Sequence, residues 1–195
     1  MTWNDSWVAF DTETTGLDGR ARIVEVAAVV FEGGVPVHEW SQLLCPEGVD
    51  WDNADVRKAL EINRIDRKDL QGRPTFSQVL PDLLMEFSHD VWVAHNASFD
   101  MRMIGQELQR LNRPALSPKM LICTLELARH FGGATNKLNE VAARFRIAME
   151  DAHRAAVDAR TCGLILNAML LEGRVPREDV AMAELTKKAA ARRRW

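Results

Sequence analysis

The chain has 195 residues, of which 47% are hydrophobic and 27% are charged, and its formal net charge at pH 7 is −3. This composition is typical of a globular protein and is sufficient for one domain with a hydrophobic core. The apolar stretch from Ile23 to Phe31 contains Glu25 and is far shorter than the roughly 20 residues of a membrane span, and Met1 to Ser6 shows no secretory signal. We therefore expect a cytoplasmic protein without a membrane partner.

The cysteines give no indication of a disulfide framework or a zinc site. Cys45, Cys123 and Cys162 are odd in number, widely spaced, and without a Cys-x-x-Cys pair or a nearby pair of histidines. We expect buried free thiols.

The first predicted strand is the apolar run from Trp7 to Phe10, and two acidic residues, Asp11 and Glu13, follow it. In a strand, residues two apart point to the same face, so these carboxylates would lie side by side and repel each other unless a cation lies between them. Carboxylate oxygens suit Mg²⁺ or Mn²⁺. The pattern predicts a metal site at the strand's end, although two acids capping an exposed strand end without a metal are common.

Two β-rich runs follow at residues 22–32 and 35–44, and Gly33 and Gly34 join them. Because both central residues of a type I′ turn need positive φ, two glycines at this place predict a hairpin. Residues 46–74 are polar and charged, with short helical pieces, and we expect them to form an excursion over the surface.

Later segments alternate between strand and helix. Thr75 and Gln78 form a possible capping box for a helix that continues to Phe87, and Pro81 either kinks this helix or starts it. The spacing of apolar residues then predicts strands at 91–94 and 120–123 and helices at 99–111, 125–132, 138–145 and 157–171. A hairpin followed by such units predicts an α/β fold, with a mixed five-stranded sheet flanked by helices.

We expect residues 1–174 to form this domain and residues 175–195 to form an Ala- and Arg-rich C-terminal tail. The tail's basic cluster is either a solvated helix end or an electrostatic contact for phosphates.

Two further acidic motifs follow the first. His95-Asn-Ala-Ser-Phe-Asp100 lies between a predicted strand and a predicted helix, where the helix dipole alone could favour Asp100. His153-Arg-Ala-Ala-Val-Asp158 places Asp158 next to the apolar stripe of its helix. An aspartate interior to a helix beside its buried face has little structural reason, which favours a functional role.

Taken in order, these motifs resemble those of the DnaQ-like, DEDD-type 3′-to-5′ exonucleases. This family includes the epsilon proofreading subunit of bacterial DNA polymerase III, oligoribonuclease and ribonuclease T. The resemblance runs from about Val8 to about Leu171, and residues 124–129 match a further stretch that is usual between the second and third motifs. It implies a ribonuclease H-like fold.

The resemblance also implies the active-site chemistry. Two divalent cations, Mg²⁺ or Mn²⁺, would be held by four carboxylates: Asp11, which bridges both ions, Glu13, Asp100 and Asp158. Two such ions can polarise an attacking water and stabilise the leaving 3′ oxygen. His153 would be the general base. A sister subclass has Tyr one residue later, where this chain has Arg154 and no Tyr anywhere.

For the substrate, the resemblance implies contacts from the turn after the first acidic pair and from the second motif. The candidates for holding the terminal nucleotide are Thr14, Thr15, Gly16 and Leu17, and those for the sugar and a stacked base are Asn96 and Phe99. Core packing remains an alternative for Leu17 and Phe99, and His95 could be structural.

Substrate preference stays open, because many relatives carry His-Gly-Ile where residues 60–65 of this chain read Leu-Glu-Ile-Asn-Arg-Ile. The leading hypothesis is a proofreading- or repair-type exonuclease that releases nucleoside 5′-monophosphates from 3′ ends of single-stranded DNA or frayed duplex. The net charge of −3 does not exclude a nucleic-acid substrate, because four of the acidic residues are predicted metal ligands and the rest of the protein is then slightly positive.

Two alternatives remain. One is an exoribonuclease that trims RNA 3′ ends, since discrimination at the sugar depends on pocket shape. The other is a catalytically silent module that binds nucleic acid or a DNA polymerase, which the presence of all five catalytic groups disfavours. The His-x₄-Asp motif argues against a ribonuclease H-like endonuclease. No clamp-binding segment is evident, which favours a stand-alone enzyme, although a polymerase remains a possible partner.

Overall fold

The computed structural model describes residues 5–132, 136–149 and 153–175. Within these ranges no helix combines the length and apolar character that a membrane crossing requires. Of the predicted C-terminal tail, Val175 is buried in the core, and residues 176–195 with their basic cluster lie outside the described residues. The three cysteines are free thiols: Cys162 is buried as expected, whereas Cys45 and Cys123 are half-buried.

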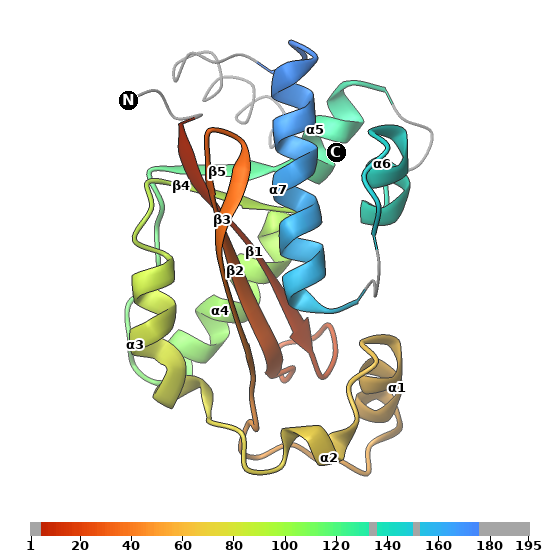
Figure 1. The fold of residues 1–195 in the computed structure, drawn as a ribbon. Coiled ribbons are helices and arrows are strands. Elements are labelled where there is room, and N and C mark those ends of the chain that lie inside the picture. Colours follow the sequence, from red (N-terminus) through yellow and green to blue (C-terminus); the bar gives the residue numbers. More distant parts are fainter. Residues whose placement is uncertain (1–4, 133–135, 150–152, 176–195) are drawn as a thin grey trace, which may run out of the picture.

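The predicted mixed sheet of five strands is confirmed (Figure 1). The strands are β1 (Ser6–Thr14), β2 (Ile23–Glu32), β3 (Val35–Leu43), β4 (Val91–Ala94) and β5 (Met120–Cys123), in the order β3-β2-β1-β4-β5. β1, β4 and β5 are parallel, and β2 is antiparallel to both β1 and β3. The carboxyl ends of β1 and β4, each followed by a predicted motif, therefore lie at the same edge of the sheet.

The predicted hairpin between β2 and β3 is confirmed. Gly33 and Gly34 have φ of +57° and +84°, the left-handed region that glycine adopts without strain. A Cβ on Gly34 would also lie 2.2 Å from Oδ1 of Asn167, so both conformation and space require glycine at this position.

Seven helices lie in the described residues: α1 (Ala54–Ile62), α2 (Arg67–Leu70), α3 (Phe76–Glu86), α4 (Ala97–Arg110), α5 (Thr124–His130), α6 (Leu138–Arg144) and α7 (Ala155–Leu171). The capping box is confirmed, since the backbone N–H of Thr75 donates to Oε1 of Gln78 at 2.8 Å. α3 therefore begins before Pro81 and continues through it.

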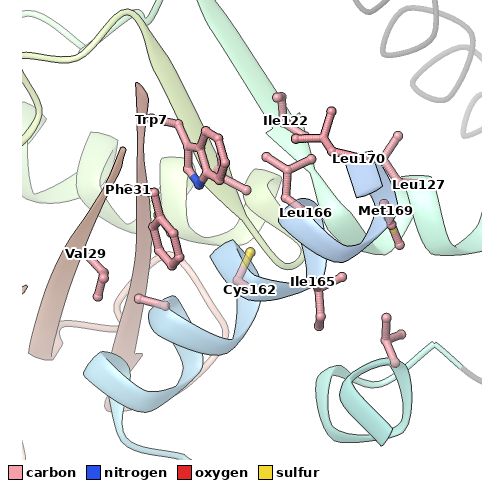
Figure 2. Close-up of a cluster of buried hydrophobic side chains, with 14 of the residues drawn as sticks. Trp7, Val29, Phe31, Ile122, Leu127, Cys162, Ile165, Leu166, Met169 and Leu170 are labelled. Carbon is pink, nitrogen blue, oxygen red and sulfur yellow. The ribbon is translucent and has the colours of Figure 1, made fainter. Parts of the chain in front are cut away.

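Helices cover both faces of the sheet. α3 and α4 pack on one face, and α5, α6 and α7 pack on the other, while α1 and α2 lie beyond the ends of the long strands (Figure 1). The α7 face is a continuous hydrophobic cluster, in which side chains from the sheet meet those of α7 (Figure 2). Trp7 and Phe31 stack there with ring centroids 5.5 Å apart. Gly163 allows α7 to approach, because a Cβ at this position would lie 2.2 Å from the Phe31 ring.

The two clusters also show how the side chains of β1 are divided between the faces. Trp7 and Ala9 belong to the α7 cluster, whereas Val8 and Phe10 belong to the α3 and α4 cluster. Continuing this alternation places Asp11 and Glu13 on the α7 face and the residue between them on the α4 face.

Candidate active site

The first acidic pair lies inside β1, because this strand continues beyond the apolar run to Thr14. Asp11 is half-buried and Glu13 is buried, with 8% of its surface exposed. The two residues thus lie on the same face of β1, as the period of two predicted, but within the strand rather than after its end.

Asp100 joins this pair from the other side of the sheet. It lies in the first turn of α4, is 2% exposed, and its Oδ1 accepts hydrogen bonds from the backbone N–H of Thr12 at 3.0 Å and from the Thr12 hydroxyl at 2.8 Å. Thr12 therefore links α4 directly to β1 between the two acids. The sequence interpretation missed this role.

Asp158 reaches the same region from α7. Because α7 begins at Ala155, Asp158 lies in the first turn, so the expectation of an aspartate interior to the helix was wrong and the helix dipole does supply a structural reason for it. Its Oδ1 is nevertheless buried and lacks a hydrogen-bond partner among the described residues. An unpartnered buried carboxylate oxygen is costly, which is consistent with a ligand there.

His153 precedes α7 and adopts a left-handed conformation, with φ of +69°. Its side chain is exposed, and its backbone N–H donates to the Asp158 carboxylate. Ligand atoms of Glu13, His153 and Asp158 all lie within 4.8 Å of one another, and this is the group in the described part of the chain that could hold a metal ion. The third motif is thus brought to the first, as predicted.

The electrostatics of the four carboxylates fit a divalent cation. Burial, followed by repulsion from Asp158 and other acids, raises the pKa of Glu13 to about 8. Burial likewise raises the pKa of Asp100 to about 7 and that of Asp158 to about 6, and it raises the pKa of Asp11 well above its usual value, with repulsion from Asp100 as the next cause. Hard oxygen donors that repel one another are a suitable set for Mg²⁺ or Mn²⁺.

A cavity of about 660 Å³ lies between the turn after β1 and α1, and its lining begins at Thr14, the residue after Glu13. All four residues predicted to hold a terminal nucleotide line it: Thr14, Thr15, Gly16 and Leu17. Leu17 is 77% exposed, which excludes core packing as its role. The hydroxyl of Thr14 donates to the Gly16 carbonyl at 2.6 Å, and that of Thr15 accepts from the Arg22 backbone at 2.9 Å. These two side chains stabilise the turn.

The other two predicted substrate residues do not line this cavity. Asn96 is exposed and caps α4 with φ of +69°, while Phe99 is half-buried against the α3 and α4 cluster. The Arg102 guanidinium lies 5.2 Å from the centroid of the Phe99 ring and donates to the Leu17 carbonyl at 3.1 Å. Arg102, which the sequence interpretation missed, therefore connects Phe99 to the turn that lines the cavity.

His95 links three segments. Its Nε2 donates to the Asn136 carbonyl at 2.9 Å, and its Nδ1 is 2.9 Å from the Thr124 hydroxyl. Burial lowers the pKa of His95 and favours its neutral form. These contacts support the structural alternative for this residue, because they join the end of β4 to α5 and to the chain that precedes α6.

Asn63 is a further contact to the turn that was not predicted. It is 7% exposed, and its side-chain amide donates to the Thr14 carbonyl at 3.0 Å. It lies in the segment where the sequence departs from the His-Gly-Ile of many relatives. The next residue, Arg64, has φ of +53°, which is strained for a residue with a Cβ. The difference from His-Gly-Ile was the only sequence signal for a special role of this segment, and the contact itself depends on how α1 packs near the end of β1.

Glu25 is a fourth residue that sequence reasoning passed over, after Thr12, Arg102 and Asn63. It is directly opposite Glu13 in the register of β1 and β2, and it is 1% exposed. A charge in the middle of an otherwise apolar strand was a usable signal, because buried carboxylates are rare without a partner.

Comparison with known proteins agrees with this geometry. The RNase_T family model, described as an exonuclease, matches residues 8–166. The chain belongs to this exonuclease family. The DNA polymerase III subunit epsilon of Treponema pallidum (strain Nichols) is 32% identical over 170 residues, which cover 85% of this chain and 76% of the relative.

Two further comparisons define the extent of the likeness. The PolC-type DNA polymerase III of Clostridium perfringens (strain 13 / Type A) is 32% identical over 169 residues, and the match covers 85% of this chain but only 11% of that polymerase. Exonuclease X in complex with 5′ overhanging duplex DNA is 27% identical, with a TM-score of 0.71, and the match covers 92% of this chain and 99% of that protein. The predicted family and the ribonuclease H-like fold are both confirmed.

Proposed function

We propose that this chain hydrolyses phosphodiester bonds from the 3′ end of single-stranded DNA or a frayed duplex and releases nucleoside 5′-monophosphates. The observation that carries the proposal is the convergence of Glu13, His153 and Asp158, with their ligand atoms within 4.8 Å of one another, while the turn that directly follows Glu13 in the chain lines a cavity.

Asp11, Glu13, Asp100 and Asp158 would hold two divalent cations, Mg²⁺ or Mn²⁺. When bound, such ions polarise the phosphoryl oxygens and stabilise the leaving 3′ oxygen. Two contacts support this assignment, since Thr12 holds Asp100 against β1 and α7 brings Asp158 close to Glu13. Their raised pKa values imply that they bind metal more tightly as they deprotonate.

His153 would accept the proton of the attacking water. Its imidazole is exposed, so water and substrate can reach it, and it lies within 4.8 Å of the Glu13 and Asp158 carboxylate oxygens. Histidine suits this role because its charge changes near neutral pH.

The turn after β1 would hold the terminal nucleotide. Leu17 offers an exposed apolar surface to a base, and the hydrogen bonds of Thr14 and Thr15 keep the turn in one shape. Phe99, with the Arg102 guanidinium above its ring, offers a surface on which a second base can stack. Asn96, three residues earlier in the chain, would contact the sugar.

The relatives favour DNA over RNA as the substrate. The names of the curated relatives refer to DNA polymerase III, and exonuclease X was solved with duplex DNA. A DNA polymerase is accordingly the partner that we propose. RNA 3′ ends remain the competing substrate, because the metal ligands and the base do not contact the 2′ position that distinguishes the two.

A time course on 5′-labelled single strands of DNA and RNA with identical sequence tests both points. With Mg²⁺ present, we expect a ladder that shortens from the 3′ end, with DNA degraded faster than RNA. Asp11→Ala should give no ladder. Faster degradation of RNA would overturn the substrate, and no ladder from a folded protein on either strand would favour the silent binding module.

Chelation provides the test of the cofactor. We expect EDTA to stop the reaction, and Mn²⁺ to restore it at least as well as Mg²⁺. Undiminished hydrolysis after exhaustive chelation would contradict the assignment of the four carboxylates as metal ligands.

A further inference from the structure

An ion pair between a buried carboxylate and a half-exposed guanidinium lies beside the candidate metal ligands. Glu25 of β2 is 1% exposed, and the Arg154 guanidinium donates to both of its carboxylate oxygens, from Nη2 to Oε1 at 2.8 Å and from Nε to Oε2 at 3.1 Å. A pair with two parallel hydrogen bonds fixes the orientation of the guanidinium as well as its position. Arg154 is therefore held in one place relative to the sheet.

The same carboxylate also caps α7. Oε2 of Glu25 accepts from the backbone N–H of Ala155, the first residue of the helix, at 3.2 Å, and Oε1 accepts from the Ser41 hydroxyl at 3.3 Å. Arg154 is the N-cap residue of α7 and makes no side-chain capping bond of its own. Glu25 of β2 thus accepts a hydrogen bond from the first turn of α7, as an N-cap side chain usually does, and its negative charge suits a helix N-terminus.

The pair is directly connected to the candidate base. His153 is the residue immediately before Arg154, and its φ of +69° is a conformation that residues with a Cβ adopt at a cost. Glu25 is opposite Glu13 in the register of β1 and β2. The clamp formed by Glu25 and Arg154 therefore joins the strand next to Glu13 to the backbone that carries His153.

Stability alone is a weak reason for such a pair. Removing the Glu25 carboxylate from water costs desolvation free energy that its attraction to the half-exposed Arg154 repays only in part, and apolar replacements of such pairs are often equally stable. A clamp that sets the direction of a neighbouring side chain is a better explanation here, because three of the four hydrogen bonds that Glu25 accepts come from the two residues that follow His153, and the fourth comes from Ser41.

We propose that Glu25 and Arg154 are positioning residues for His153, and that their ion pair holds the His153 imidazole toward the Glu13 and Asp158 carboxylates in the orientation that accepts a proton. The inference rests on the proposed function in that His153 is taken as the base of the reaction.

Arg154→Lys tests the clamp, because lysine keeps the positive charge but cannot make the two parallel hydrogen bonds. We expect kcat to fall about 10- to 100-fold, as small misplacements of a catalytic group do, while KM changes by less than about twofold. Mn²⁺ binding should stay as in the wild type. The matched control is Arg160→Lys on the same helix, which removes the guanidinium hydrogen bonds of an exposed pair with Glu39 and should leave kcat unchanged.

A double-mutant cycle separates positioning from general structural damage. If Arg154 acts through His153, Arg154→Lys should lower kcat by less than about twofold when His153 is already replaced by Ala. An equal loss in both backgrounds would overturn the proposal, and so would a rise in KM or weaker Mn²⁺ binding that accounts for the loss. If Arg154→Lys does not fold, Glu25→Gln takes its place under the same criteria, since it keeps the size and one acceptor oxygen.

A spectroscopic measurement decides the point without turnover. In long-range ¹H–¹⁵N spectra of the imidazoles, Arg154→Lys should shift or broaden the His153 signals, while those of His38, which pairs with Glu86 at 3.1 Å elsewhere on the surface, stay in place. Unchanged His153 signals would overturn the positioning role. If the wild type were inactive but Arg154→Lys still shifted the His153 signals, the result would contradict the proposed function and leave the positioning role intact.

Discussion

The two ends of α7 differ in what they contribute. Toward the C-terminus the helix carries Ile165, Leu166 and Met169, each at most 1% exposed within the hydrophobic cluster of Figure 2. At the N-terminus it carries Asp158 in its first turn, close to Glu13 and to His153. One end packs, and the other holds like charges near each other.

The difference teaches how the fold tolerates its candidate site. A pKa raised by one unit corresponds to about 1.4 kcal/mol, so ionising Glu13, whose pKa is raised to about 8, costs several kcal/mol in the metal-free protein. Burying one aliphatic side chain gains roughly 1.5–3 kcal/mol. Burying two or three such residues at the apolar end is thus of the same order as the cost of ionising Glu13, which comes first from burial and then from repulsion by Asp158.

The strongest effect is expected at the charged end of α7 and follows from replacing Asp11. Asp11→Asn should lower kcat about 10³-fold or more, because metal-assisted charge stabilisation is worth several kcal/mol. The same change should raise the melting temperature of the metal-free protein, since it removes a carboxylate that is disfavoured by burial and by repulsion from Asp100. Hydrolysis rates and thermal melts in EDTA check both, with Asp90→Asn, an exposed acid paired with Lys119, as the control. A lower melting temperature for Asp11→Asn would contradict the repulsion.

Removing the candidate base should affect the rate without affecting the packed end. His153→Ala should cut kcat by about 10²–10⁴-fold. Because His153 is exposed, the variant's free energy of unfolding and its affinity for substrate should stay close to those of the wild type. Single-turnover rates and urea denaturation measure the two quantities. A rate close to that of the wild type would remove His153 from the mechanism.

A substitution at the packed end of α7 should have the opposite effect, lowering stability without changing the rate. Leu166→Ala should lower the free energy of unfolding by about 2–5 kcal/mol, because Leu166 is fully buried and its loss leaves a cavity. kcat per folded molecule should remain that of the wild type at a temperature well below melting. If kcat fell in parallel with stability, the two ends of the helix would be coupled and the division of labour between them would be incorrect.

The pH dependence of stability should sharpen the same contrast. Folded-state pKa values of about 6 for Asp158, about 7 for Asp100 and about 8 for Glu13 exceed those of the unfolded chain, so the folded protein binds more protons between about pH 4 and pH 8. The metal-free protein should therefore lose stability as pH rises through this range.

Mg²⁺ should restore this stability more at pH 8 than at pH 5, since the ion binds deprotonated carboxylates. Urea denaturation at several pH values, with and without Mg²⁺, measures both effects. A metal-free stability that rises steadily from pH 4 to pH 8 would show that the carboxylates are not under strain.

The smallest expected effect concerns the turn that lines the cavity. Asn63→Ala removes the hydrogen bond to the Thr14 carbonyl, and a buried group left without its partner costs about 1–3 kcal/mol. Because the turn would hold the terminal nucleotide, we expect KM to rise by roughly 3- to 10-fold with little change in kcat. Asp66→Ala removes the N-cap of the neighbouring α2, outside the cavity, and is the control for general loosening of this region. Equal effects of both changes would assign the rise to the region as a whole.

Much of this protein was accessible from sequence because its signals are local. Gly33 and Gly34 require positive φ in a two-residue turn, and the hairpin is where they predict it. The apolar periodicities likewise predicted every strand of the sheet and the helices that cover it. The predicted helix at 157–171 begins two residues after the observed start of α7 at Ala155, and Asp158 lies in the first turn with either start, so its interpretation as an interior residue was wrong.

The sequence by itself determined the family, the order of the elements and the residues of three acidic motifs, because each depends on neighbours within a few positions. Only the tertiary structure decided which groups support those motifs: Thr12 on Asp100, Asn63 on Thr14, and Glu25 on Arg154. Each of these contacts joins residues from different elements, the closest of them 49 positions apart in the chain. The physical reason is that a hydrogen bond requires its atoms to lie within about 3 Å, and only the packing of strands and helices brings distant residues so close.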